Sequence, residues 1–103
     1  MGLFSFFSQK DTTNEIKSYL EKDAVILDVR TKMEWDDDGH ISQAKHIVLN
    51  LVPLEIDKIK AWNKPVIAVC RSGGRSAQAT QFLKQHGVDV INGGPWQNVA
   101  QYI

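Results

Sequence analysis

Cys70 is the only cysteine in the chain, and it follows directly after the apolar run at 65–69. In open α/β sheets, ligands bind beyond the carboxyl ends of the strands, so a cysteine at this position lies where a site is expected. A helical pattern begins soon after it, and the backbone N–H groups and dipole of a helix N-terminus attract anions. Such a setting lowers the pKa of a thiol from about 8.5 and increases the thiolate fraction at neutral pH. The sequence therefore predicts that Cys70 is a nucleophile.

The residues after Cys70 favour an anion-binding loop. Two adjacent glycines leave successive backbone amides free to turn inward, and two arginines supply positive charge. We expect Arg71 to project toward the mouth of the site and Arg75 to hold part of the shape of the loop. The alternatives are a buried structural cysteine, an ordinary turn and surface arginines, and none of these needs the glycines and arginines together. The predicted substrate-binding residues are Arg71, Ser72, Gly73, Gly74, Arg75 and Ser76.

The elements that position this loop follow from the hydrophobic pattern. Short apolar segments typical of buried strands occur at 24–27, 46–49, 65–69 and 88–91. Helical patterns occupy 12–22, the stretch from 31 to the acidic run at 36–38, 53–62, 77–87 and 95–103. Strands that alternate with helices predict an α/β fold, with a central parallel sheet of about five strands, right-handed crossovers and helices on both faces.

Shorter signals mark the ends of these elements. Thr12 with Glu15, and Thr31 with Glu34, have the spacing of a capping box at a helix N-terminus. Gly87 is predicted to end the helix that follows the cysteine loop. The other local expectations are Met33 and Trp35 pointing inward, a solvated turn at 36–38, Pro53 in the first turn of a helix, and a turn at 92–94.

The length and composition bound the kind of protein. A chain of 103 residues with 43% hydrophobic and 23% charged residues is expected to fold as one domain, 1–103, in which 1–10 is a loosely ordered N-terminal extension. The apolar cluster at 3–7 is too short to span a membrane. Twelve basic and twelve acidic residues cancel, which argues against nucleic acid and membranes as partners. Because one cysteine cannot form an intramolecular disulfide, we expect a cytoplasmic location. We also expect a monomer.

Four motifs, in order along the chain, resemble those of the rhodanese family, in particular its single-domain sulfurtransferases. The loop that begins at Cys70 resembles the active-site loop of that family. The likeness extends over nearly the whole chain through Asp28-Val29-Arg30 with Glu34, Gly39-His40-Ile41 with Ala44, and Asn92-Gly93-Gly94 with Trp96.

The resemblance implies a single rhodanese-like domain with sulfurtransferase activity. Cys70 would take a sulfane sulfur from thiosulfate or a related persulfide or polysulfide donor, store it as a persulfide, and pass it to cyanide or a thiol. No cofactor would be needed, and a thiol-bearing partner protein would be another kind of acceptor. The residues of the loop agree with this chemistry, because attack on thiosulfate expels sulfite and a cationic loop stabilises the developing charge.

Four polar residues of the other motifs are predicted to be structural and to lie near the site. Arg30 and Glu34 are four residues apart near a helix start and are predicted to form an ion pair. His40 is predicted to be a turn histidine, because sulfur transfer from a preformed thiolate needs no general base. The resemblance implies that Asp28 is structural as well. No metal site is expected, because the other histidines are isolated and the chain has one cysteine.

Two alternatives remain beside the sulfurtransferase. One is a non-enzymatic module that carries sulfur or binds a partner without turnover, although an intact cysteine loop argues against a module that only binds. The other is a phosphatase or arsenate reductase, which also uses a cysteine and an arginine in a loop between a strand and a helix. Four residues separate Cys70 from Arg75, whereas a phosphate cradle needs five, so this loop favours a sulfur atom.

Overall fold

A parallel sheet of four strands, in the order β2-β1-β3-β4, organises residues 12–103, the part of the chain that this computed structural model describes. Its elements in chain order are α2 (Thr13–Glu21), β1 (Val25–Asp28), α3 (Lys32–Asp37), β2 (Lys45–His46), the 3-10 helix η1 (Leu49–Glu55), α4 (Ile56–Ala61), β3 (Val66–Cys70), α5 (Gly74–Gln85), β4 (Val90–Pro95) and α6 (Trp96–Ala100).

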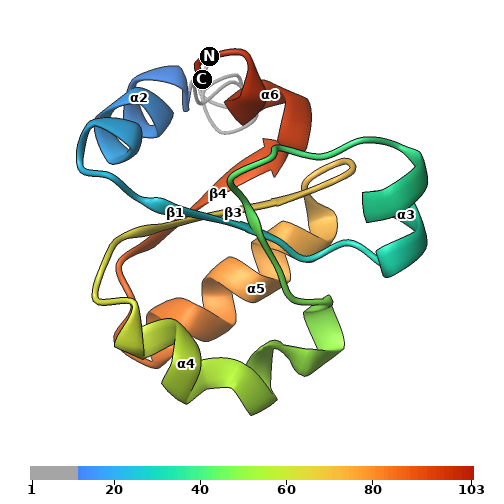
Figure 1. The fold of residues 1–103 in the computed structure, drawn as a ribbon. Coiled ribbons are helices and arrows are strands. Elements are labelled where there is room, and N and C mark those ends of the chain that lie inside the picture. The colour runs from blue at the N-terminus through green and yellow to red at the C-terminus, as the bar shows by residue number, and fades with distance from the viewer. Residues whose placement is uncertain (1–11) are drawn as a thin grey trace, which may run out of the picture.

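The helices form a layer on each face of this sheet. Figure 1 shows α2 and α6 above the sheet and α4 and α5 below it, with α3 beyond one end. Two apolar clusters fill the spaces between sheet and helices, one on the side of α5 and one on the side of α2 and α6. The predicted α/β architecture is therefore confirmed, with four strands in the described residues instead of about five.

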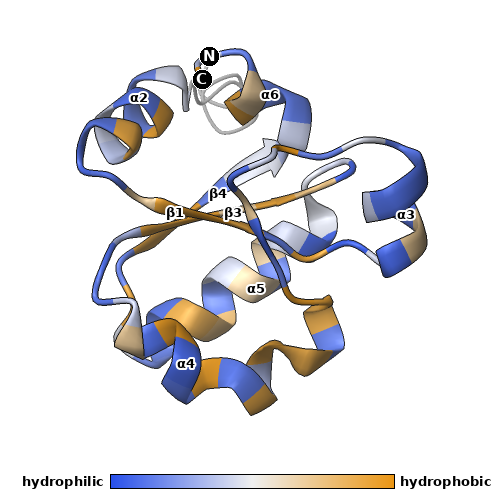
Figure 2. Cartoon of the chain, viewed as in Figure 1, coloured by the Kyte–Doolittle hydropathy of each residue, from blue (hydrophilic) through white to orange (hydrophobic). Residues whose placement is uncertain are grey.

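Strand β3 is the centre of both clusters. Val66, Ala68 and Cys70 belong to the cluster on the α5 side, whereas Ile67 and Val69 belong to the opposite cluster. This alternation is the period of two that a strand imposes, and all five residues are buried because helices cover both faces. The continuous apolar colouring of the central strands in Figure 2 follows from the same arrangement.

All four predicted strands have different bounds in the structure, and the differences are largest for the segments predicted at 46–49 and 88–91. Of the segment predicted at 46–49, only His46 belongs to the strand β2. The Ile47 and Leu49 N–H groups still donate to the Asp28 and Val29 carbonyls, and the 3-10 helix begins at Leu49. The predicted turn at 92–94 is wrong, since these residues lie inside β4. Between Asn92, which is opposite Ala68, and the next pair the register shifts by one residue, which is a β-bulge.

The local signals had mixed outcomes. The capping box of Thr31 and Glu34 is present, whereas Thr12 makes no side-chain cap, because its backbone does not have the extended conformation that Thr31 has. Met33 is 72% exposed, so its predicted inward orientation is wrong. Pro53 lies inside the 3-10 helix, before the α-helix at Ile56–Ala61 begins. Gly87 follows α5 with a φ of 83°, as a residue that ends a helix does.

Two expectations about the N-terminal residues, the apolar cluster at 3–7 and the extension over 1–10, lie outside the described residues. Within 12–103, none of the helices combines the length and the apolar composition needed to cross a membrane.

Candidate active site

The sulfur of Cys70 lies at the carboxyl end of β3, in a cradle formed by the loop that follows. The Gly73 N–H donates to Sγ with a nitrogen-to-sulfur distance of 3.0 Å, and the Ser76 N–H donates at 3.4 Å. The Ser76 hydroxyl oxygen lies 3.3 Å from Sγ. Cys70 is only 1% exposed, so these loop groups, rather than bulk water, surround its side chain.

The backbone of the loop is shaped by Gly73, which has a φ of 105°. Residues with a side chain rarely adopt this left-handed conformation, so the sequence needs glycine here. Helix α5 begins immediately afterwards, at Gly74, and its first turn supplies the Ser76 N–H that points at the sulfur. The loop therefore turns two N–H groups of one short segment toward one atom, as predicted for an anion-binding loop.

Opposing effects act on the pKa of Cys70. Burial raises it, because desolvation penalises the thiolate. Hydrogen bonds from the Ser76 hydroxyl and from the backbone N–H groups of Ser76, Gly73 and Ser72 lower it, and their combined effect prevails. The pKa of Cys70 is therefore lower than that of an ordinary thiol, which favours the nucleophilic form.

Asn92 of β4 also joins this network, which sequence reasoning did not anticipate. Its side-chain oxygen accepts from the Ser76 hydroxyl at 2.6 Å and from the Gly94 N–H at 2.9 Å, and its side-chain nitrogen donates to the Gly73 carbonyl at 3.2 Å. The only sequence signal was the position of Asn92 in the closing motif, directly before two glycines.

The two predicted loop arginines are placed very differently. Arg75 forms a two-pronged ion pair with Glu34 of α3, with distances of 2.7 Å from Nη1 to Oε1 and 2.8 Å from Nη2 to Oε2. Arg71 is exposed, and its side chain has no hydrogen bond or ion pair with any described residue. Of the two guanidinium groups, that of Arg71 is thus available to an incoming anion.

The predicted ion pair between Arg30 and Glu34 is wrong, because each side chain pairs with another partner. Arg30 contacts Asp28 through Nε and Nη2, with a shortest distance of 2.7 Å, and both side chains are 1% exposed. A second bond from Nη2 to the Gly39 carbonyl and the Trp96 ring complete the surroundings of this guanidinium. A buried charge needs such a complete set of partners, which the exposed side of a helix start does not offer.

His40 lies on the outside of this region. It is exposed, its Nδ1 is 2.7 Å from the Trp35 carbonyl oxygen, and its ring stacks on the Trp35 ring with centroids 3.6 Å apart. These contacts are those of a histidine that fixes a turn. Among residues 12–103, no three His, Cys, Asp or Glu side chains are grouped so that they could hold a metal ion.

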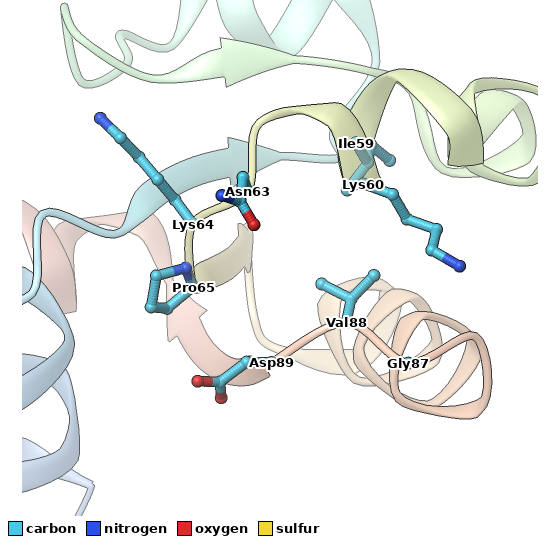
Figure 3. A pocket seen from close by; sticks show the side chains of 8 residues that line it. All are labelled: Ile59, Lys60, Asn63, Lys64, Pro65, Gly87, Val88 and Asp89. Carbon is cyan, nitrogen blue, oxygen red and sulfur yellow. The ribbon is translucent and has the colours of Figure 1, made fainter.

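A hollow of about 390 Å³ lies at the opposite end of the sheet, away from Cys70. Pro65 and Asp89 immediately precede β3 and β4, so this hollow is at the amino ends of the strands. In Figure 3 the side chains of Lys60 and Lys64 point away from each other, and the Lys64 ammonium is paired with Asp23 at 2.7 Å. The hollow shares no lining residue with the cysteine loop. Its lining residues are Ile59, Lys60, Asn63, Lys64, Pro65, Gly87, Val88 and Asp89.

Comparisons with known proteins agree with this geometry. A family model described as a rhodanese-like domain matches residues 12–96, which is most of the chain. A sulfurtransferase from Allochromatium vinosum is 35% identical over 66 residues, which cover 64% of this chain and 60% of that protein. The match thus spans less than two thirds of the length of this curated relative.

Solved structures show the same similarity. A rhodanese-like domain protein from Staphylococcus aureus is 32% identical, with a TM-score of 0.64, covering 84% of this chain and 86% of that chain. A human single-domain sulfurtransferase has a TM-score of 0.65 and 24% identity, covering 87% of this chain and 93% of that chain. The second likeness shows the fold alone.

Proposed function

This chain belongs to the rhodanese family, and we propose that it moves a sulfane sulfur from thiosulfate, or from a related persulfide or polysulfide, to a thiophilic acceptor. The sulfur is carried as a persulfide on Cys70. The observation that carries the proposal is the cradle of N–H groups around Sγ, which suits a sulfur anion both before and after the transfer.

The reaction has two displacement steps. In the first, the Cys70 thiolate attacks the outer sulfur of thiosulfate, the sulfur–sulfur bond of the donor breaks, and sulfite leaves with the bonding electron pair. In the second, cyanide or a thiolate attacks the outer sulfur of the persulfide, and the Cys70 thiolate is the leaving group. With cyanide the product is thiocyanate, and neither step needs a metal or an external oxidant.

The loop residues divide these tasks. We assign Arg71 to capture of the donor dianion, because its guanidinium is exposed and unpaired within the described residues. The amides of Gly73 and Ser76 stabilise the charge on sulfur, and Ser72 and Gly74 complete the loop against which the donor binds. Arg75 was predicted both to bind substrate and to hold part of the shape of the loop, and in this proposal it has the second role, through its pair with Glu34.

The cellular setting is part of the proposal. We place the protein in the cytoplasm, because a nucleophilic cysteine must stay reduced and the chain has no second cysteine to protect it as a disulfide. We also propose that it is a monomer. The acceptor is a small thiol or cyanide, or the thiol of a partner protein. We propose no polyanionic partner such as nucleic acid or anionic lipid, because the net charge of the chain is zero.

Intact-mass measurement tests the proposal directly. After incubation with thiosulfate, the protein is expected to gain the mass of one sulfur atom, and Cys70→Ser is expected to gain none while keeping its fold. When cyanide is added, the gain disappears and thiocyanate forms. In steady-state assays with both substrates varied, double-reciprocal plots give parallel lines, as a stored intermediate requires.

Three outcomes separate the alternatives. A wild-type protein that gains no sulfur contradicts the proposal, as does turnover by Cys70→Ser close to that of the wild type. A protein that gains sulfur but releases it only to another protein is a sulfur carrier. The four-residue spacing and the engagement of Arg75 by Glu34 do not support a phosphatase or arsenate reductase.

A further inference from the structure

The side-chain amide of Asn92 is held in one orientation by its backbone partners. Its Oδ1 accepts from the Gly94 N–H, and its Nδ2 donates to the Gly73 carbonyl. Turning the amide over would place an NH₂ group against an N–H donor and an oxygen against a carbonyl, so both bonds would be lost. Oδ1 is therefore the atom that faces the Ser76 hydroxyl.

The Ser76 hydroxyl has two polar partners and one proton. Its oxygen is 2.6 Å from Asn92 Oδ1 and 3.3 Å from Cys70 Sγ. Because Oδ1 carries no hydrogen, the shorter contact requires Ser76 to donate to Asn92. The hydroxyl can then only accept from Cys70, which matches an S–H thiol. Ser76 is 0% exposed, so water does not replace either partner.

Ionisation of Cys70 changes this arrangement. The S–H bond breaks, the proton leaves to solvent, and the sulfur can now only accept hydrogen bonds. A lone pair of Ser76 Oγ would repel the thiolate, whereas the O–H group turned toward Sγ makes a charge-assisted bond. That rotation breaks the bond from Ser76 to Asn92 Oδ1.

We propose that Asn92 is a positioning residue that competes with the sulfur for the Ser76 proton. Asn92 holds this proton while Cys70 is a thiol and releases it to the sulfur when Cys70 is a thiolate. The proposal rests on the proposed role of Cys70 as the nucleophile. Its consequence concerns the protein without substrate. There, a smaller fraction of Cys70 is thiolate than if Asn92 did not accept the hydrogen bond of the Ser76 hydroxyl.

The competition fixes the sign of the expected effect. Without Oδ1, the Ser76 hydroxyl is free to donate to sulfur, so Asn92→Ala is expected to lower the pKa of Cys70. A purely structural role predicts the reverse, because losing the bonds to Gly73 and Gly94 loosens the loop whose N–H groups stabilise the thiolate.

The charged groups near the sulfur are the same in the wild type and in Asn92→Ala. The guanidinium of Arg75 interacts through its charge with Cys70 and Asp28 and is paired with Glu34. None of these groups is a partner of the Asn92 amide, so its replacement by alanine adds or removes no charge.

The test is titration of the thiolate by its ultraviolet absorbance, which reports a single group because the chain has one cysteine. Asn92→Ala is expected to lower the pKa of Cys70 by roughly 0.5 to 1, the equivalent of one neutral hydrogen bond. In the Ser76→Ala background, the same change is expected to have no effect. Asn98→Ala is the matched control, because Asn98 is an exposed amide on the neighbouring helix α6. Thermal unfolding confirms that each variant is folded.

A rise or no change in the pKa of Cys70 in Asn92→Ala overturns the proposal, and so does an equal fall in both backgrounds. If Asn92→Ala does not fold, Asn92→Asp decides the question. Its carboxylate keeps the acceptor for Ser76 and holds the proton more strongly, so the pKa of Cys70 should rise, and rise less in the Ser76→Ala background. An equal rise in both backgrounds contradicts the competition. The titration uses no sulfur donor, so its outcome is independent of the persulfide assay.

Discussion

The ion pair between Glu34 and Arg75 is expected to make an important contribution to stability, because it joins two elements that are distant in sequence. It connects α3, beyond the end of the sheet, to the first turn of α5, where the cysteine loop ends. Both oxygens of Glu34 are used, and the side chains of Arg75 and Glu34 are 34% and 19% exposed. Two-pronged and partly shielded pairs of this kind exceed the usual surface ion pair in strength.

The size of the effect follows from the pKa of Glu34. The hydrogen bond from Arg75, partly opposed by desolvation and assisted by Thr31, lowers this pKa from 4.5 to about 2. Such a change corresponds to at most about 3 kcal/mol, and solvent screening at a partly exposed pair reduces it to about 1 to 2 kcal/mol. Glu34→Gln is therefore expected to reduce the free energy of unfolding at neutral pH by about 1 to 2 kcal/mol.

The pH dependence follows from the direction of the shift. Because the folded-state pKa of Glu34 is depressed, the stabilisation is complete above the unfolded value of 4.5 and is lost as the pH falls toward 2. Urea unfolding of wild type and Glu34→Gln from about pH 7 to about pH 2.5 should thus show a difference that shrinks across this window.

A matched substitution shows whether the pairing is responsible. Glu55→Gln removes a carboxylate from an exposed pair with Lys58 at 3.4 Å, and it should change stability by less than about 0.5 kcal/mol at every pH. If the Glu34→Gln difference stays constant down to the lowest pH, or equals that of Glu55→Gln, the ion pair does not hold α3 and the loop together as reasoned.

Two other substitutions test different parts of the molecule. Arg71→Ala should raise the KM for thiosulfate roughly 5- to 150-fold with little change in kcat, because it removes a donor-binding charge worth about 1 to 3 kcal/mol; equal KM values across a salt series would assign donor binding to the backbone amides. Gly93→Ala should cost about 1 to 3 kcal/mol in urea unfolding, because a Cβ there would lie 2.7 Å from Ile67 Cγ2 and 2.9 Å from Val99 Cγ2. Gly74→Ala is its control, since a Cβ there meets no atom within 4 Å, and equal stability of the two variants would contradict the packing argument.

The part of the site that could be predicted from the sequence is the part encoded in adjacent residues. A strand that ends at Cys70, a glycine-rich loop and a helix start lie within a few positions, so their geometry follows from local backbone preferences. The capping box of Thr31 and Glu34 was predictable for the same reason, because its two hydrogen bonds span three residues.

The ion pairs were not predictable in this way, since their partners are set by the fold. Spacing along a helix predicted an ion pair between Arg30 and Glu34. When a side chain has more than one opposite charge nearby, however, burial and geometry determine which pair forms. Glu34 pairs with Arg75 across 41 positions, while the buried Arg30 takes the carboxylate of Asp28 at the end of β1. Only the parallel pairing of β1 with β3 brings these groups to the same edge of the sheet.

Asn92 shows why the local sequence pattern predicted a turn for the closing motif, which instead lies inside a strand. An asparagine followed by two glycines is typical of a turn, because these residues tolerate positive φ values and tight backbone contacts. A bulge inside a strand requires the same properties: Gly94 has a φ of 76°, and Gly93 is packed too closely for a Cβ. The register shift that separates bulge from turn depends on pairing with Ala68 and Val69, which lie more than twenty positions earlier. Because that pairing also brings Asn92 to the Ser76 hydroxyl, the residue that we propose to compete with the sulfur for the Ser76 proton could be recognised only from the folded sheet.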